Sequence, residues 1–557
     1  MSLIERRIGL LFALFALALC IVVARAAWLQ GFRGSELQAQ AQSQHVETVT
    51  VPGSRGAILD RNGTELAVSE DAASVFATPY QVENPPQAAR KLAQLLDADE
   101  RKILEQLTAA DSGFEYIARK VSLPTAEEIR KLDLAGIGLL PDSHRFYPQG
   151  ELAAQVIGSV GVDNQGLTGL EASQEDALHG TEGSREIVRD ALGVELERNT
   201  LAGAETGEDL TLTIDAGIQA RTEEVLKGIA ETYSPAGASA IVMDPRTSEV
   251  LAIANYPAYD PADPGSAKDD ELLNRATGYT FEPGSTFKAF TVAGALEDGV
   301  VTPETTFDLP PVITVADREI GESHDRGYVT LSVSEILAQS SNVGAVKVGL
   351  TLNEAEGHDR FDHWVREFGF GSPTGIDFPG EEQGIVLQPE EYSGSTMGNL
   401  PIGQGLSVTP IQMATAYSAI ANGGVLRQPR VLLESGGVPT ERPPGERIIS
   451  RSNAEKLREM LEGVLAAGGT ASEVSVPGYT LAGKTGTAEK VVDGEYSDYL
   501  FDASFVGFAP AEKPRLLVSI LVDEPEGDYY GGTVAAPAFG EIAQFALPYL
   551  GIEADAK

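Results

Sequence analysis

The sequence is poor in the residues from which disulfides and metal sites are built. Its 557 residues include one cysteine, Cys20, which lies in an N-terminal apolar run. A single cysteine excludes an intrachain disulfide and a cysteine-based metal site. The six histidines lack metal-ligand spacing, and we expect the nearest pair, His358 and His363, to lie on the surface. We therefore expect a protein that uses no metal.

Basic residues are also scarce. The chain has 41 Lys and Arg against 82 Asp and Glu, which gives a formal net charge of -41. Nucleic-acid binding needs a basic surface, so this balance argues against a nucleic-acid partner. The acidic residues are spread along the chain, which is typical of a solvated surface and not of a disordered tail. The length allows two or three domains with sizeable cores.

The one long apolar run is at the N-terminus and predicts a transmembrane anchor over residues 8–29. Arg6 and Arg7 precede it, so residues 1–7 are expected in the cytoplasm and everything after the anchor outside. A cleaved signal peptide could use the small residues around Arg25, but the run is longer than most signal-peptide cores. We therefore favour an uncleaved, single-pass anchor in the cell membrane.

Residues 30–206 show no catalytic constellation. A strand pattern covers 45–51, and Asn62-Gly63 marks a tight hairpin turn. Helical patterns follow at about 86–96, 98–109 and 125–132. We interpret this segment as an extended, non-catalytic pedestal that holds the rest of the chain away from the membrane.

Residues 207–557 have the pattern of a mixed α/β domain. Strand signals at 210–214, a hairpin over 238–254 and two later strands predict an antiparallel sheet packed between helices. Ser452 and Glu455 suggest a capping box at the start of a helix that runs to Leu465. The later strands and other helices are expected at 504–508, 516–522, 409–421 and 535–550.

The stretch Glu282-Pro283-Gly284-Ser285-Thr286-Phe287-Lys288 leads into an apolar helical pattern that Gly299 ends. On a helix, Ser285 and Lys288 project from one face, one turn apart. A hydroxyl beside a buried amine is a candidate nucleophile with its base. A Ser-x-x-Lys pair arises about once by chance in a chain of this length, so the pair needs support from elsewhere.

That support comes from two further elements in a fixed order. Ser340-x-Asn342 falls between two helical patterns, and Lys484-Thr485-Gly486 opens a strand pattern. The ordered set resembles the superfamily of penicillin-binding proteins and serine β-lactamases. Beyond these motifs, the sequence resembles class B penicillin-binding proteins over essentially the whole chain. The segments that carry this resemblance are the anchor, 55–63, Gly169-Leu170-Glu171, 212–215 and 505–510.

The resemblance implies a peptidoglycan D,D-transpeptidase without cofactor. Ser285 would be the nucleophile, Lys288 its base, and Ser340 with Lys484 the proton relay. Burial and the charge of Lys484 would keep Lys288 neutral. Asn342 would hold the amide of the substrate, Thr485 and Thr487 its carboxylate, and Gly486 would leave room for it as an added strand. The backbone N–H groups of Ser285 and Thr487 would form the oxyanion hole.

The same resemblance implies the partners. These are stem peptides that end in D-Ala-D-Ala, an amine acceptor, β-lactams, the membrane and a SEDS-family glycosyltransferase. Asn274-Arg275-Ala276 and Glu282 are similar to the division-specific, FtsI-like branch, which predicts septal cell-wall synthesis.

Other hypotheses stay open at this point. An elongation-specific class B transpeptidase would share nearly all of these features. A serine β-lactamase would need a deacylating base, for which Glu381, Glu382, Glu390 and Glu391 lie in the right interval of the chain. A β-lactam sensor would normally need a larger transducing part than the residues that precede the anchor. A purely structural division scaffold would not need intact motifs.

Overall fold

The computed structural model describes residues 3–32, 46–109, 113–189, 195–356, 359–492 and 494–556. His45, the first residue of a predicted strand, and His358 lie outside these ranges, whereas His363 is exposed as expected. The chain forms two compact units. The first comprises Met1–Ser54, Asp71–Ser143 and Gly180–Gly207, and the second comprises Arg55–Glu70, His144–His179 and Glu208–Lys557.

The first unit begins with helix α1 (Leu3–Phe32). Within it, Arg6–Gly31 is long and apolar enough to cross a membrane, by length and composition, with a mean hydropathy of 2.6 in its most apolar window. The unit also contains an antiparallel sheet in the order β1-β6-β7 (Val46–Val51, Gly183–Arg189, Glu195–Ala202). Its helices are α3 (Pro85–Leu96), α4 (Glu100–Leu107) and α5 (Leu123–Lys131), close to the predicted ranges.

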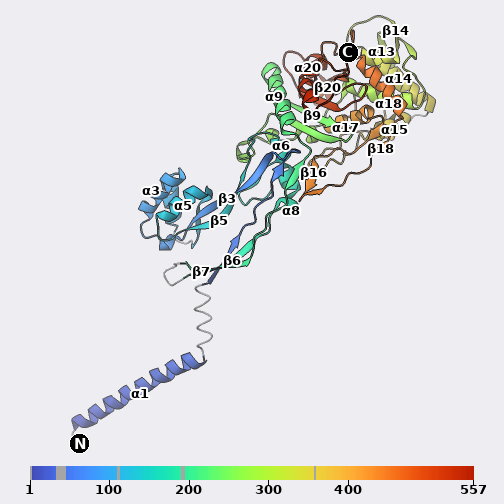
Figure 1. Ribbon diagram of the computed structural model, residues 1–557. Coiled ribbons are helices and arrows are strands. Elements are labelled where there is room, and N and C mark those ends of the chain that lie inside the picture. Colours follow the sequence, from blue (N-terminus) through green and yellow to red (C-terminus); the bar gives the residue numbers. More distant parts are fainter. Residues whose placement is uncertain are drawn as a thin grey trace. The chain divides into compact units, whose positions relative to one another are not determined.

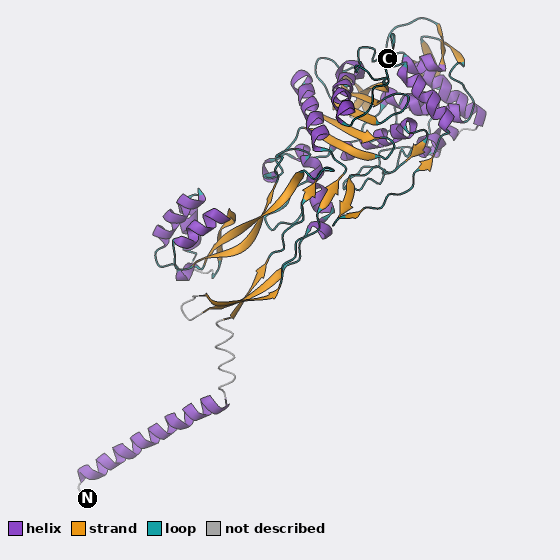
Figure 2. Cartoon of the chain, viewed as in Figure 1, coloured by secondary structure: helices purple, strands orange, loops and turns teal. Residues whose placement is uncertain are grey.

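The second unit is built on a five-stranded antiparallel sheet, shown with its helices in Figure 2. The strand order is β10-β9-β21-β20-β19, with bounds Glu249–Tyr256, Gly237–Asp244, Leu516–Asp523, Glu495–Ala509 and Ala482–Val492. The predicted hairpin over 238–254 and both later strands are therefore confirmed. β19, which begins with the Lys-Thr-Gly element, is an edge strand of this sheet.

Alternation along the strands of this sheet separates two hydrophobic cores. Ile241 and Met243 of β9 face one core, while Ala240 and Val242 face the other. The second core is covered by α9 (Ala216–Tyr233) and α20 (Ala536–Tyr549), which Figure 1 shows in green and red. The first core is covered by α12, α17 and α18 (Lys288–Glu297, Pro410–Ala421, Arg451–Glu462). The predicted sheet between helical layers is the observed fold.

The local predictions around the hairpin and the helix starts have mixed outcomes. Asn62-Gly63 does form the turn between β2 (Ile58–Leu59) and β3 (Glu65–Ala77), with Gly63 at a φ of 86°. The capping box at Ser452 is wrong, because Ser450 is the N-cap of α18 and its hydroxyl accepts from the backbone N–H of Asn453. Both serines precede an apolar helical pattern, and only the backbone conformation selects between them.

The second unit contains further short elements. Before Ser285 lie α6 (Ala154–Ile157), α7 (Gly169–Ser173), α8 (Glu175–Leu178), β8 (Leu210–Leu212), α10 (Asp269–Leu272) and α11 (Arg275–Gly278). After it lie β11 (Thr306–Leu309), β12 (Val312–Val315), β13 (Arg318–Gly321), β14 (Val329–Ser332), α13 (Val333–Ala338), α14 (Asn342–Glu356), α15 (Arg360–Glu367), α16 (Thr396–Asn399), β15 (Val425–Leu426), β16 (Leu432–Ser435), β17 (Val438–Pro439), β18 (Glu446–Arg447) and α19 (Gly531–Val534).

Candidate active site

A cavity of about 920 Å³ in the second unit contains the predicted nucleophile and elements of all three motifs. Its lining includes Ser285, Ser340, Asn342, Thr485 and Thr487. These residues are separated by up to about 200 positions in the chain, and folding brings them to one surface. We call this space the active-site cavity.

Ser285 lies in a 3-10 turn, η3 (Gly284–Phe287), that passes directly into α12 at Lys288. The predicted helix is therefore present, but its first turn is tighter than an α-helix. Gly284 has a φ of 51°, and its N–H donates to the carbonyl of Gly403 at 3.0 Å. A side chain at Gly403 would lie 2.2 Å from the carbonyl oxygen of Gly284, so this glycine allows the close approach.

Lys288 is almost completely buried, at 1% exposure. Its ammonium nitrogen donates to the carbonyl of Ser340 at 2.7 Å, to the Ser340 hydroxyl at 3.2 Å and to Oδ1 of Asn342 at 2.6 Å. Within the part of the chain that the structure describes, no hydrogen bond joins Lys288 to Ser285. Lys288 is therefore held by the second motif, one turn beyond the serine.

Burial lowers the pKa of Lys288 to about 7. Among its charged neighbours, Glu322 acts to raise this pKa and Arg326 acts to lower it. Lys484, the cation that the sequence suggested for this effect, is itself fully buried, and burial together with the charge of Lys288 lowers its own pKa well below the ordinary value. The predicted shift and its predicted main cause, burial, are both present, but Arg326 and not Lys484 is the cation that assists.

The turn that carries Ser340 and Asn342 connects α13 to α14. Ser340 has a φ of 59°, a left-handed conformation that is uncommon for residues other than glycine. Asn342 starts α14, and its amide nitrogen donates to the carbonyl of Gly321 at 3.0 Å while its oxygen accepts from Lys288. Both ends of this side chain are thus used within the protein, and each end keeps the capacity for one further hydrogen bond.

The third motif lines the cavity from β19, next to the nucleophile turn. Nζ of Lys484 donates to the carbonyl of Thr485 at 3.2 Å, and the hydroxyls of Thr485 and Thr470 lie 2.7 Å apart. The Thr487 hydroxyl accepts from the N–H of Gly531 at 3.0 Å. These contacts fix both threonine hydroxyls at the cavity wall.

Gly486 has a packing reason to be glycine. A Cβ there would lie 2.3 Å from the Ser504 hydroxyl oxygen, 2.9 Å from a methyl of Thr286 and 3.0 Å from the Pro283 carbonyl. The missing side chain therefore lets β19 approach the nucleophile turn closely. This is a different reason from the room for substrate that the sequence suggested.

Other residues of the site had no signal in the sequence motifs. The carboxylate of Glu322 accepts from the backbone N–H of Asn342 at 2.8 Å, although it lies twenty residues upstream. Phe501 and Tyr529 stack at 4.1 Å between ring centroids on the cavity wall. The consecutive Tyr529 and Tyr530 before two glycines could have been noticed in the sequence, whereas Glu322 could not, because no spacing rule connects it to the motif.

The glutamates proposed for a β-lactamase do not line the cavity. The cavity lining, as far as the structure describes it, contains none of Glu381, Glu382, Glu390 and Glu391. Glu381 instead accepts from the backbone N–H groups of Thr374 at 2.7 Å and Gly375 at 3.1 Å. A deacylating base is therefore not supplied by this loop.

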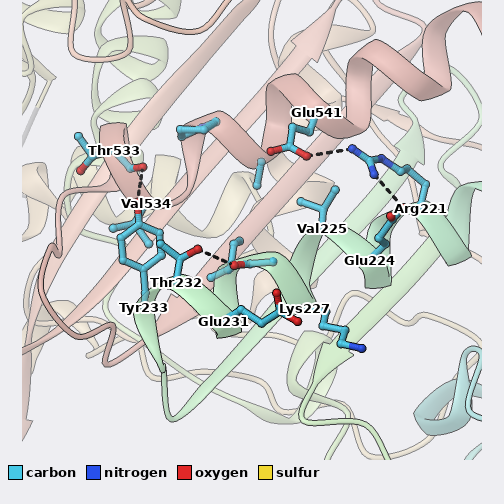
Figure 3. A pocket seen from close by; sticks show the side chains of 14 residues that line it. Arg221, Glu224, Val225, Lys227, Glu231, Thr232, Tyr233, Thr533, Val534 and Glu541 are labelled. Atoms are coloured by element: carbon cyan, nitrogen blue, oxygen red, sulfur yellow. Dashed lines mark hydrogen bonds and ion pairs between the residues drawn. The ribbon is translucent and has the colours of Figure 1, made fainter.

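A second hollow of about 620 Å³ lies between α9 and α20 (Figure 3). Arg221 crosses it to Glu541 at 2.9 Å and also pairs with Glu224 at 2.7 Å. Most of the side chains labelled in Figure 3 are exposed, and they form no combination of a nucleophile with a buried base. The chemistry thus favours the cavity at Ser285 as the active site.

Comparison with known proteins agrees with this geometry. A family model described as the penicillin binding protein transpeptidase domain matches residues 238–544, and one described as the penicillin-binding protein dimerisation domain matches 50–212. Stage V sporulation protein D of Bacillus subtilis is 37% identical over 96% of this chain and 84% of its own length. Peptidoglycan D,D-transpeptidase FtsI of Escherichia coli is 33% identical over 99% of this chain and 93% of its own length.

Solved structures are similar over most of the chain. Penicillin binding protein 3 from Mycobacterium tuberculosis in complex with ampicillin has a TM-score of 0.71 at 28% identity, and covers 91% of this chain and 98% of its own. Penicillin Binding Protein 2X from Streptococcus thermophilus has a TM-score of 0.76 at 25% identity, and covers 91% and 81%. With the family models matched in both parts and a buried lysine beside the serine, this chain belongs to the class B penicillin-binding proteins and is a peptidoglycan D,D-transpeptidase.

Proposed function

We propose that the chain cross-links septal peptidoglycan through an acyl-enzyme on Ser285, and that β-lactams acylate the same serine. The observation that carries this proposal is the state of Lys288. It is buried beside the nucleophile turn, and its pKa is lowered to about 7, so a large fraction is neutral at neutral pH. A neutral amine is the form that can take a proton from a serine hydroxyl.

The contacts of Lys288 suit this role. A neutral amine has two N–H donors, which can serve the two shortest bonds, to the carbonyl of Ser340 and to Oδ1 of Asn342. Its lone pair is then free to accept a proton from Ser285 or from the Ser340 hydroxyl at 3.2 Å. The protonated amine donates all three bonds. The turn therefore accommodates both protonation states without rearrangement.

The reaction follows from these groups. Oγ of Ser285 attacks the carbonyl carbon of the penultimate D-Ala while its proton moves to Lys288. The amide C–N bond breaks, and the terminal D-Ala leaves with a proton delivered through Ser340 and Lys484. The amine of a second stem peptide then attacks the ester, loses a proton along the same path, and releases Ser285 as the cross-link forms.

Substrate binding is assigned to residues of the second and third motifs that line the cavity. Thr485 and Thr487 would bind the terminal carboxylate, supported by the positive potential of Lys484, and Asn342 would bind the substrate amide. Gly486 would keep the strand edge close to the nucleophile turn. The oxyanion would lie between the backbone N–H groups of Ser285 and Thr487, a contribution of about 3–4 kcal/mol per donor in a serine enzyme.

The division role rests on finer features. Glu282, next to the nucleophile turn, accepts from the N–H of Gly405 at 3.0 Å and from the Tyr496 hydroxyl at 3.1 Å. Relatives of similar identity are named peptidoglycan D,D-transpeptidase FtsI and stage V sporulation protein D. Depletion in the native organism should cause filaments with incomplete septa, whereas rounded cells would support the elongation alternative.

The anchor and the partners belong to the same proposal. Helix α1 would cross the membrane once, with residues 1–7 in the cytoplasm and the catalytic part outside. Residues 30–206 would form the pedestal and 207–557 the transpeptidase domain. The anchor and pedestal would contact a SEDS-family glycosyltransferase, which co-purification of the full chain with and without α1 would test.

The nucleophile has a direct test. Ser285→Ala should abolish covalent labelling by a fluorescent penicillin, while Ser266→Ala, in a surface loop outside the cavity, should be labelled like the wild type. Persistent labelling of folded Ser285→Ala would disprove the assignment. Rapid turnover of penicillin by the wild type would support the β-lactamase alternative instead.

A further inference from the structure

The loop that joins β13 to β14 reaches the start of α14, where the second motif lies. The Glu322 carboxylate accepts from the backbone N–H groups of Asn342 at 2.8 Å and Val343 at 3.3 Å, and from the Ser341 hydroxyl at 2.7 Å. Its side chain is 6% exposed. Glu322 therefore satisfies the free donors at the N-terminus of α14 from a distant segment.

Arg326 completes this arrangement. Its guanidinium forms an ion pair with Glu322, and it donates to the Ser341 hydroxyl at 2.5 Å. The Ser341 hydroxyl also accepts from the backbone N–H of Gly344 at 2.9 Å. The middle residue of the second motif, which is 1% exposed, is thus enclosed by one carboxylate and one guanidinium.

The same turn meets Lys288 on its other side. Ser340, at a φ of 59°, directs its carbonyl to Lys288, and Asn342 directs its oxygen there. A left-handed conformation at a serine persists when the surrounding contacts hold it. Ser341 and the backbone N–H of Asn342 are the two points where Glu322 holds the turn.

We propose that Glu322 and Arg326 are positioning residues for acylation, which hold the 340–342 turn against Lys288 and set the balance of charge beside that lysine. This inference rests on the proposed roles of Ser285 and Lys288. Neither residue of the pair touches the reacting atoms; both act through the turn and through their field.

The charges of the pair act on Lys288 in opposite senses. The anionic Glu322 favours the protonated amine, and the cationic Arg326 disfavours it. The other polar groups around Lys288 are Ser340 and Asn342 on the turn, Ser285 on η3, and Lys484 on β19, whose charge interacts with that of Lys288. His324, on the same loop as the pair, lines the cavity and is unchanged in every variant below.

The test is the pH profile of the second-order rate of acylation by a fluorescent penicillin, measured on the folded, full-length protein. Arg326→Gln removes the cation, so the acid limb of the profile should move to higher pH by about half to one unit. The acylation rate near pH 6 should then be about three- to tenfold lower than in the wild type. The plateau near pH 9 should stay within about twofold of the wild type. Glu322→Gln should move the acid limb to lower pH. It should also lower the plateau rate of acylation, because the 340–342 turn loses a charged hydrogen-bond acceptor.

Two further variants separate charge from geometry. Glu322→Asp keeps the charge with a shorter reach, so it should lower the plateau but leave the limb near its wild-type position. Asp325→Asn, an exposed carboxylate between the pair without a hydrogen bond to the turn in the described structure, should leave both unchanged.

The outcomes are distinct. Opposite shifts of the limb in Glu322→Gln and Arg326→Gln, with the double variant between them, would establish the proposal. Folded variants whose plateau rate and acid limb equal those of the wild type would overturn it. Variants with lower melting temperatures but an unchanged pH profile of acylation would also overturn it. If Ser285→Ala were still labelled, the proposed function itself would fail, and this result is independent of the pair.

Discussion

Among the charged side chains that the second unit buries, two groups are paired differently. Arg55 and Arg145 both contact the fully buried carboxylate of Glu171, at 2.9 and 2.7 Å. Lys288 and Lys484 are buried as completely, but their hydrogen bonds go to carbonyl, hydroxyl and amide oxygens. The first group joins distant segments through ion pairs, whereas burial lowers the pKa of both lysines in the second.

The difference shows how burial acquires a function. A buried cation with a carboxylate partner is stabilised in its charged form, and the pair then contributes to the structure. A buried cation without one is stabilised in its neutral form, which makes it a base. Arg also remains protonated in proteins, while a Lys shifts its pKa readily, so the residue types match the two roles.

The largest effect is expected from Lys288→Met. Removal of the base should slow acylation by about 10²- to 10⁴-fold. Among the residues that the structure describes, no carboxylate forms a hydrogen bond or ion pair with Lys288. The free energy of unfolding should therefore fall much less than after loss of Glu171. Stopped-flow acylation and urea unfolding of the same sample measure both quantities. Wild-type acylation in this variant would remove Lys288 from the mechanism.

Glu171→Gln should instead lower the stability strongly and change the acylation rate little. It leaves Arg55 and Arg145 buried without their shared carboxylate, a change that typically costs about 3–5 kcal/mol. Acylation per folded molecule should change little, because Glu171 does not line the active-site cavity. Urea unfolding combined with active-site titration checks this. A variant as stable as the wild type would show that the group is not structural.

The third expectation concerns pH. With the pKa of Lys288 near 7, the acylation rate should fall about tenfold per unit below that pH and level off above it. The same lowered pKa means that the unfolded chain binds more protons between about pH 7 and pH 10, so this lysine's contribution to stability becomes more favourable as pH rises through that window. A rate independent of pH from about 5 to 9 would contradict the assignment.

The smallest effect is expected from Glu175→Gln. Glu175 also pairs with Arg55, at 2.6 Å, but its side chain is 34% exposed. Burial acts to raise its pKa, but hydrogen bonds from Arg55 and Gly166 lower it overall, so its stabilising effect is present near neutral pH and is lost as pH falls. We expect a loss of about 1 kcal/mol or less in urea unfolding. A loss as large as that of Glu171→Gln would mean that pairing alone, without burial, determines the effect.

Much of the fold was accessible from pattern. Short runs of apolar and β-branched residues located β9, β10, β20 and β21, and an apolar helical pattern with a closing glycine located α12. The N-cap of α18 was missed because Ser450 and Ser452 are chemically equivalent signals two residues apart. Helix boundaries depend on backbone conformation, which neighbouring segments select.

The features of the site also divide into those that the sequence predicts and those that only the folded structure determines. By itself, the sequence determined the three motifs, the apolar anchor helix and the main strands of the sheet, because each depends on residues that are close along the chain. Only the tertiary structure decided which groups surround Lys288: the turn at Ser340, the carboxylate of Glu322 and the guanidinium of Arg326. It also decided that burial, more than Lys484, lowers the pKa of Lys288. Desolvation and charge depend on distances through space, and no spacing along the chain records them.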